Sequence, residues 1–230
     1  MKKLQEIVWS ASQRIRQKRA AIFRRSFGFD ETTKILDIGS ESGDHIRLVL
    51  EGTKVLPQNV YIADINGEVI QKGSQQYGFV PVLLFELDKL PFEDKFFDIV
   101  YCSSVIEHAT VPKEKVWNIV SEREFRESAW EKQKLLAREI SRVGRQFFVQ
   151  TPARTFPVES HIWLPFFGFL PRPMQIKIMS LTNEFWIKQA IPDFHLLDGK
   201  QMAELFPEAE IVFERKLGFV KSIMAIKSLR

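Results

Sequence analysis

Residues 34–45 constrain the fold more than any other part of the chain. Ile35, Leu36 and Ile38 are too few for a buried helix and predict a short central strand of a parallel sheet. Two glycines follow, and they allow a backbone turn that side chains would crowd. A parallel strand of this kind brings its carboxyl end to the crevice where open α/β sheets bind ligands. Asp37 is therefore expected at the mouth of that crevice.

A second acid follows at the spacing of a βαβ unit. Residues 59–64 predict another strand, and this strand ends in Asp64, 27 residues after Asp37. That separation suits a carboxylate that binds the ribose of a nucleotide held at the first turn. The pattern predicts an α/β fold with a Rossmann-like, doubly wound sheet that is mostly parallel. Strands are expected at residues 35–38, 59–64, 81–87, 96–102 and 145–150, helices at 44–50, 66–77, within 111–142 and at 198–206, and a C-terminal antiparallel hairpin at 209–215 and 220–227.

Positive charge is concentrated at the start of the chain. The whole chain has a net charge of +4, but residues 1–28 hold eight basic residues and one acid, which leaves the remainder net acidic. Apolar residues at helical spacing in residues 4–27 predict a basic amphipathic helix. This leader favours contact with phosphates or an anionic membrane surface, although a solvated helix with a basic outer face is the simpler alternative. The acidic body argues against a nucleic-acid groove, so no nucleic-acid partner is expected.

Cysteine content and hydropathy bear on the compartment. Cys102 is the only cysteine, which excludes an intrachain disulfide and a four-cysteine zinc site. The longest apolar stretch, residues 162–170, is shorter than the roughly 20 residues that a membrane span needs. The basic start also lacks the apolar core of a signal peptide. We expect a cytoplasmic protein, with peripheral contact at the inner membrane surface left open.

Four motifs occur in order along the chain. They are the turn after Asp37, the strand ending in Asp64, Leu87-Asp-Lys-Leu-Pro-Phe92 ahead of a strand, and Ser103-Ser-Val-Ile-Glu-His108 after that strand. This series resembles the class I S-adenosylmethionine-dependent methyltransferases, and most of all their type-11 branch, over about residues 32–150. The resemblance implies an S-adenosylmethionine-dependent enzyme with a methyltransferase domain over residues 29–230, preceded by the basic helix 1–28. It also implies an insertion on the acceptor side at about residues 151–180.

The resemblance implies roles for individual residues. The turn glycines would let the backbone approach the methionine end of the cofactor, and Asp64 would accept hydrogen bonds from the ribose. Asp88 would meet the adenine edge, and Ser103 and Ser104 would lie near the sulfonium. The predicted cofactor-binding residues are Asp37, Gly39, Ser40, Glu41, Gly43, Asp64, Ile65, Leu87, Asp88, Lys89, Ser103 and Ser104.

Glu41 departs from the family pattern, which has glycine at the middle of the turn. Its side chain either crowds the methionine portion of the cofactor or bonds its ammonium group, and the sequence leaves both outcomes open. If Glu41 fills the site, the chain is a non-catalytic binding protein whose basic leader docks on a membrane or nucleic acid. A nicotinamide-dependent oxidoreductase is a third hypothesis, but the third glycine of its motif is missing.

Two histidines are the predicted catalytic residues. Displacement at a sulfonium needs mainly alignment and exclusion of water, but a hydroxyl acceptor also benefits from a base. His108 follows the fourth strand and His161 lies in the insertion, and the alternative for each is a structural role. No metal is predicted, although Glu107 with His108 resembles a pair that binds a divalent ion in some quinone-precursor methyltransferases.

The acceptor is predicted from the insertion. Residues 151–167 resemble a segment of bacterial type-11 members found among polysaccharide and cell-envelope genes. This implies methyl transfer, at oxygen, to a small-molecule, sugar or lipid-linked acceptor. The alternative is that the aromatic residues of this stretch merely cap the sheet.

Overall fold

The computed structural model describes residues 16–87, 89–159, 161–184 and 189–229 of the 230-residue chain. Asp88 and most of the expected basic helix lie outside the described residues.

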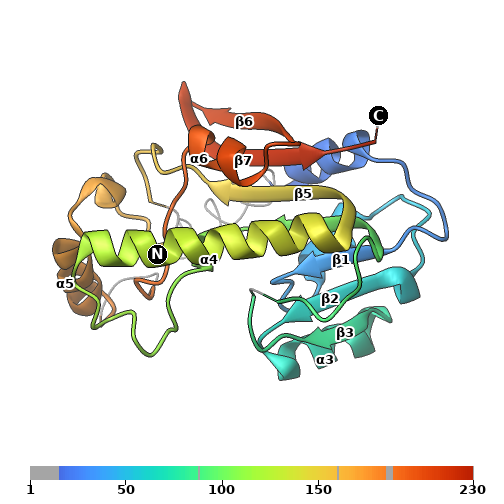
Figure 1. The fold of residues 1–230 in the computed structure, drawn as a ribbon, viewed down its shortest axis with the longest axis horizontal. Helices are drawn as coiled ribbons and strands as arrows, with labels where there is room; N and C mark the ends of the chain where they lie inside the picture. Colours follow the sequence, from blue (N-terminus) through green and yellow to red (C-terminus); the bar gives the residue numbers. More distant parts are fainter. Residues whose placement is uncertain (1–15, 88, 160, 185–188, 230) are drawn as a thin grey trace, which may run out of the picture.

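A seven-stranded sheet forms the centre of the molecule, in the order β3-β2-β1-β4-β5-β7-β6 (Figure 1). Strands β1 to β5 are parallel, β7 pairs antiparallel with β5, and β6 pairs antiparallel with β7. This topology confirms the predicted α/β class and the C-terminal hairpin. The strands are β1 Ile35–Ile38, β2 Val60–Asp64, β3 Val80–Leu83, β4 Phe97–Ser103, β5 Gly144–Pro152, β6 Glu210–Lys216 and β7 Phe219–Lys227.

Helices cover both faces of the sheet. A helix over residues 16–26 packs on one face together with α2 and α3, and its Phe23 meets Tyr101 and Phe148 at ring-centroid distances of 5.2 and 5.6 Å. On the other face, α4 and α6 bury Leu136, Ile140 and their neighbours. Burial on two faces explains why the central strands are almost wholly apolar. The helices are α2 Asp44–Val49, α3 Gly67–Tyr77, α4 Glu122–Val143, α5 Arg172–Thr182 and α6 Gly199–Leu205, with 3-10 turns η1 Pro57–Asn59, η2 Ile106–His108 and η3 Phe167–Phe169.

Helix α4 begins later than the charge pattern of residues 111–142 predicts. Residues 111–121 form turns and irregular backbone, and Ser121 caps α4 by accepting a hydrogen bond from the Glu124 amide at 3.3 Å. The buried Arg172 guanidinium holds the preceding loop by donating to the carbonyls of Val116 and Ile119. A local cap and a distant arginine therefore override a helical charge pattern.

The insertion between β5 and α6 contains α5, which the sequence does not predict. Pro171 and Pro173 stand at its start, where a helix tolerates proline because the first amides have no partner inside the helix. In Figure 1, α5 lies at the end of the molecule where α4 begins. The insertion has its own apolar cluster, separate from the two clusters on the sheet, formed by Ile162, Phe167, Met179, Phe194 and Leu196.

Candidate functional site

The glycine turn after β1 has the conformation that the motif predicts. Gly39 and Gly43 have φ angles of +70° and +77°, a region that L side chains rarely adopt. A Cβ on Gly39 would lie 2.3 Å from Cγ2 of Val105, in the loop after β4. Glycine is therefore needed here both for the turn and for the close approach of two loops at the carboxyl edge of the sheet.

The backbone amides around the glycine turn and after β2 bind the side chain of Asp64. The Glu41 amide donates to Oδ2 of Asp64 at 3.1 Å, and the Asn66 amide donates to Oδ1 at 3.0 Å. Each carboxylate oxygen has a second lone pair, so Asp64 can still accept from a ribose. Glu41 has φ +49° and an exposed residue surface, so it is strained but not buried in the crevice.

Asp37 lies at the end of β1 and is only 3% exposed. Burial raises the pKa of its carboxyl group well above the ordinary value, and the nearby negative charge of Asp64 raises it further. A cationic group bound beside Asp37, such as an ammonium, would favour the ionised form. Ser40, on the same turn, is also buried.

Four buried polar atoms near this turn have no hydrogen-bond partner among the described residues: Oγ of Ser40, Nε2 of His45, the hydroxyl of Tyr101 and Nε2 of Gln150. The Arg19 guanidinium, from the helix over residues 16–26, donates to Oε1 of Gln150 at 2.9 Å. Unpaired polar atoms inside a protein are costly unless a ligand or water satisfies them. Together with Asp37 they suit a zwitterion such as the methionyl end of S-adenosylmethionine, so these residues fit that cofactor. We call this group, with Asp64, the cofactor crevice.

Ser103 and Ser104 join this crevice from the end of β4. Oγ of Ser103 donates to Oε1 of Gln150 at 2.7 Å, and Oγ of Ser104 donates to the same atom at 3.3 Å. Ser104 has φ +59°, a strained conformation for serine and one often found at functional sites. The structure thus brings together the predicted residues of β1, β2 and β4.

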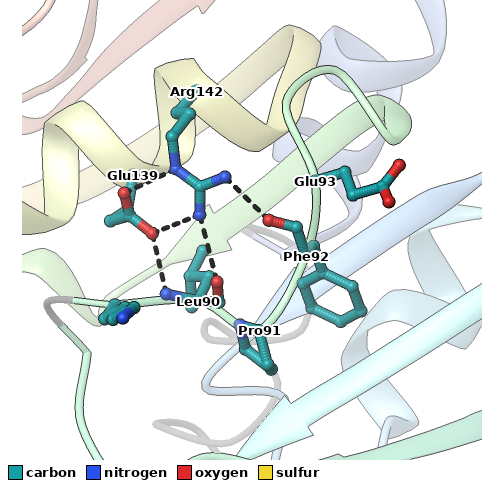
Figure 2. A pocket seen from close by; sticks show the side chains of 7 residues that line it. Leu90, Pro91, Phe92, Glu93, Glu139 and Arg142 are labelled. Carbon is teal, nitrogen blue, oxygen red and sulfur yellow. Dashed lines mark hydrogen bonds and ion pairs between the residues drawn. The ribbon is translucent and has the colours of Figure 1, made fainter.

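Leu87 and Lys89 lie on the loop that follows β3, which α4 clamps (Figure 2). Arg142 donates to the carbonyls of Leu90 and Phe92, and Glu139 accepts from the Leu90 amide at 2.8 Å. The clamp borders an open depression of about 590 Å³. Its charged groups are already paired with each other and with backbone, so we regard the clamp as a device that positions the loop. At the start of this loop the Leu84 amide donates to the Asp64 carbonyl at 2.9 Å, and Ile65 is 53% exposed.

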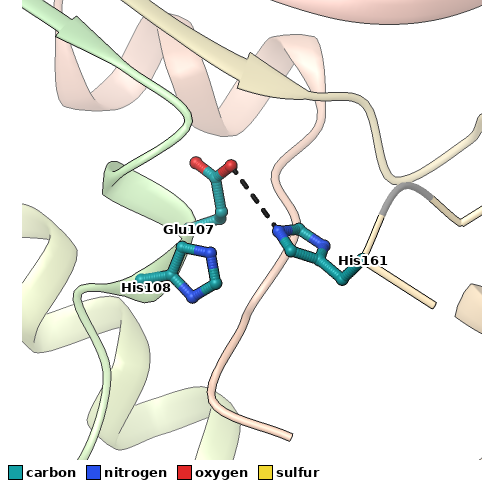
Figure 3. Close-up of side chains that lie close together, drawn as sticks. All are labelled: Glu107, His108 and His161. Atoms are coloured by element: carbon teal, nitrogen blue, oxygen red, sulfur yellow. Dashed lines mark ion pairs between the residues drawn. The ribbon is translucent and has the colours of Figure 1, made fainter. Parts of the chain in front are cut away.

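The two predicted catalytic histidines meet in space. The rings of His108 and His161 are 4.8 Å apart between centroids and nearly perpendicular. Figure 3 shows both rings turned toward the Glu107 carboxylate. Glu107 and His108 belong to η2, whereas His161 comes from the insertion and stacks on Phe194 at 4.3 Å. We call Glu107, His108 and His161 the histidine cluster.

Each ring is held by its own carboxylate. Nδ1 of His108 lies 3.0 Å from Asp193, and Nδ1 of His161 lies 2.7 Å from Glu159. Burial lowers the pKa of His108, but the hydrogen bond to Asp193 and the charges of Glu107 and Asp193 outweigh it, so the pKa is raised. Burial raises the pKa of Glu159, but hydrogen bonds from the His161 ring and from two backbone amides lower it overall. The rings are therefore fixed in orientation by ionised acceptors.

Several site residues are absent from the sequence prediction. Asp193 and Glu159 orient the rings, Thr151 donates to Glu107, and Arg19 reaches Gln150. Only Glu159 gives a local signal, because it is two residues from His161. The others meet their partners across 44 or more residues, a relation that no spacing rule detects.

One known family model matches the segment that holds most of this crevice. Residues 36–122 match a family model described as "Methyltransferase domain", the type-11 model. This confirms the resemblance for that segment, which includes the turn, Asp64 and both β4 serines, and S-adenosylmethionine is the cofactor that the match indicates. No curated protein sequence matches the chain.

Solved structures give the same fold at low identity. PH0226 protein from Pyrococcus horikoshii has a TM-score of 0.55 and 18% identity, with 95% of this chain and 91% of that one covered. Magnesium protoporphyrin IX methyltransferase from Synechocystis, solved with bound SAH, has a TM-score of 0.52 and 14% identity over 98% and 87%. A SAM-dependent methyltransferase from Methanosarcina mazei has a TM-score of 0.50 and 17% identity over 91% and 98%. At this identity the comparison establishes the class I methyltransferase fold alone.

Proposed function

We propose that this protein transfers the methyl group of S-adenosylmethionine to an oxygen of a small-molecule, sugar or lipid-linked acceptor. Residues 29–230 would form the catalytic domain, with the insertion on the acceptor side. The observation that carries the proposal is the histidine cluster: two imidazoles and a buried carboxylate converge just beyond the strand whose terminal serines border the cofactor crevice.

Different residues of the chain bind the cofactor and accept the proton of the acceptor. Asp37, Arg19 and the unpaired polar atoms around them bind the methionyl group, and Asp64 accepts from the ribose. S-adenosylmethionine supplies a methyl group on an already activated sulfonium, so alignment and exclusion of water do most of what remains. An acceptor hydroxyl also needs to lose a proton, and an imidazole held at Nδ1 by a carboxylate presents Nε2 to accept one.

The surroundings of the cluster support an acceptor larger than a simple alcohol. A hollow of about 190 Å³ lies between the start of α4 and the insertion. It is lined by Phe125, Phe169 and Phe194 and by the cations Arg126 and Arg154, and Phe194 also stacks on His161. Aromatic walls suit a sugar ring or a lipid chain, while Arg126 and Arg154 are already paired with Glu122 and Asp198.

Glu41 is exposed to solvent, which is compatible with an open cofactor site, and we place the enzyme ahead of a non-catalytic binding protein. A cytoplasmic protein with peripheral membrane contact remains our proposal for location. In the described part of the chain, no helix has the length and apolar character required to cross a membrane.

Transfer of label tests the proposal. Purified protein is incubated with S-adenosylmethionine labelled in the methyl group and with a panel of sugar, glycolipid and phenol acceptors, and labelled product and released S-adenosylhomocysteine are measured. We expect product with a hydroxyl acceptor and loss of product in His161→Ala. Tight cofactor binding without any transfer, in the native chain and across the panel, would favour the binding protein.

A further inference from the structure

Glu107, His108 and His161 offer one ligand atom each, and these atoms all lie within 4.8 Å of one another (Figure 3). Two of the residues are neighbours on η2, but the third comes from the insertion more than 50 residues later. The fold, not a local motif, therefore assembles the set.

The outer contacts of the two rings are those of metal-binding histidines. In metal sites the ring nitrogen that faces away from the ion usually donates to a carboxylate, which fixes the tautomer and the orientation of the ring. Here Asp193 and Glu159 accept from the Nδ1 atoms at 3.0 and 2.7 Å. Oε2 of Glu159 is already engaged by the His161 and Ile162 amides at 2.7 and 2.8 Å, so Glu159 acts as the acceptor. The Nε2 atom of each ring faces Glu107 (Figure 3) and presents a lone pair when it carries no proton.

Glu107 adds a buried negative charge to these lone pairs. Its residue surface is 0% exposed, and its Oε2 atom accepts from the Thr151 hydroxyl at 3.0 Å. Its Oε1 atom has no hydrogen-bond partner among the described residues and lies 3.9 Å from Nε2 of His161. If neither ring carries a proton on Nε2, a buried carboxylate oxygen that faces these nitrogens is unfavourable unless a metal cation lies between them.

We propose that Glu107, His108 and His161 bind one divalent first-row transition ion of the Zn²⁺ class, with Asp193 and Glu159 as outer partners. Two imidazoles and one carboxylate form a common ligand set for such ions, and three protein ligands leave a position for a substrate oxygen. Mg²⁺ prefers an all-oxygen set and does not suit this one. Ligand bonds of about 2.0–2.1 Å require the ligand atoms to draw closer when the ion binds, to separations of about 3.3 Å.

The inference deepens the proposed function, since the ion would polarise the acceptor hydroxyl that the rings otherwise serve as base. Binding of the metal ion does not require methyl transfer. The test therefore contains neither cofactor nor acceptor. Metal-stripped full-length protein is titrated with Co²⁺ and with Zn²⁺. Cobalt absorption reports the coordination, and elemental analysis after dialysis reports the stoichiometry.

We expect one ion per chain, no competition from millimolar Mg²⁺, and loss of stoichiometric binding in His161→Ala. His45→Ala is the matched control, because His45 belongs to the cofactor crevice and not to the three ligands, so in the absence of cofactor its removal should leave metal binding unchanged. Glu159→Gln keeps every ligand and should weaken binding by about 10–100-fold, which covers the case in which His161→Ala does not fold. Absence of stoichiometric binding by the native chain, or equal affinity in the native chain and Glu159→Gln, overturns the proposal.

Discussion

The cofactor crevice and the histidine cluster both lie beyond the carboxyl ends of the strands, but the chain builds them in different ways. The crevice takes Asp37, Gly39 and Asp64 from consecutive βα turns, and backbone conformation does much of the positioning. The cluster takes its parts from η2, from the insertion and from the loop before α6. Most of the first region lies in the segment that matches the methyltransferase family model, whereas the second depends on side-chain contacts between residues far apart in the sequence.

The largest expected effect separates the two regions directly. His161→Ala should slow methyl transfer by roughly 10²–10⁴-fold, the usual contribution of a group that activates a hydroxyl. Cofactor affinity should stay unchanged, because His161 is not among the residues of the crevice. Calorimetric titration with S-adenosylhomocysteine and single-turnover rates measure the two quantities. An unchanged rate would return His161 to a structural role.

Asp64→Ala is the reciprocal experiment. Each hydrogen bond lost between a charged acceptor and the ribose should cost roughly 1.5–3 kcal/mol of cofactor binding free energy. The rate at saturating cofactor should fall much less. Calorimetry again gives the affinity, and equal affinity for the variant and the native chain would mean that the ribose binds elsewhere.

Gly73→Ala tests how tightly α3 packs against the glycine turn of the crevice. A Cβ at Gly73 in α3 would lie 2.2 Å from the backbone oxygen of Ser42, so α3 must shift away from the glycine turn. We expect a loss of about 1–3 kcal/mol in the free energy of unfolding, measured by urea denaturation. Gly67→Ala in the same helix is the control, because its nearest neighbour would be at an ordinary 3.5 Å. Equal effects of the two substitutions would contradict the packing argument.

Asp37→Asn should separate stability from binding. Because burial and Asp64 raise the folded-state pKa above the ordinary 3.8, the protonated carboxyl favours the folded state and this stabilisation is lost as pH rises through the folded pKa. The cofactor-free Asn variant should therefore melt at a higher temperature than the native chain at pH 7, and the difference should vanish near pH 3.8 and below. Thermal melts across this range measure it. Cofactor affinity should fall, since the ammonium loses its anionic partner.

The smallest expected effect is that of Glu41→Gly. A non-glycine residue in the left-handed region costs about 1–2 kcal/mol, and part of this is returned by the greater freedom of glycine in the unfolded chain. The variant should be more stable by a few tenths to about 1 kcal/mol, with cofactor affinity nearly unchanged. A large gain in affinity would show that the Glu41 side chain obstructs the crevice.

The contrast between the cofactor crevice and the histidine cluster also explains which features can be predicted from the sequence. The mostly parallel sheet, the hairpin, the glycine turn and a second strand that ends at Asp64 all follow from residue patterns within about 30 positions, and the structure confirms them. The meeting of His108 with His161 is not visible in such patterns, and neither is the support from Asp193. Phe194 stacks on His161, and Arg172 joins the start of α5 to the loop before α4. Long-range contacts of this kind leave no periodic signal in the chain.

The separate apolar cluster of the insertion has a consequence for how the protein opens. Its members, Ile162, Phe167, Met179, Phe194 and Leu196, pack on one another rather than on the sheet. A region with its own small core unfolds at a lower free energy than the whole domain and as one cooperative unit. Amides of the insertion should exchange with solvent together, ahead of those in β1 and β4. Local opening of the insertion would then admit a bulky acceptor while the sheet stays folded and the bound cofactor stays covered.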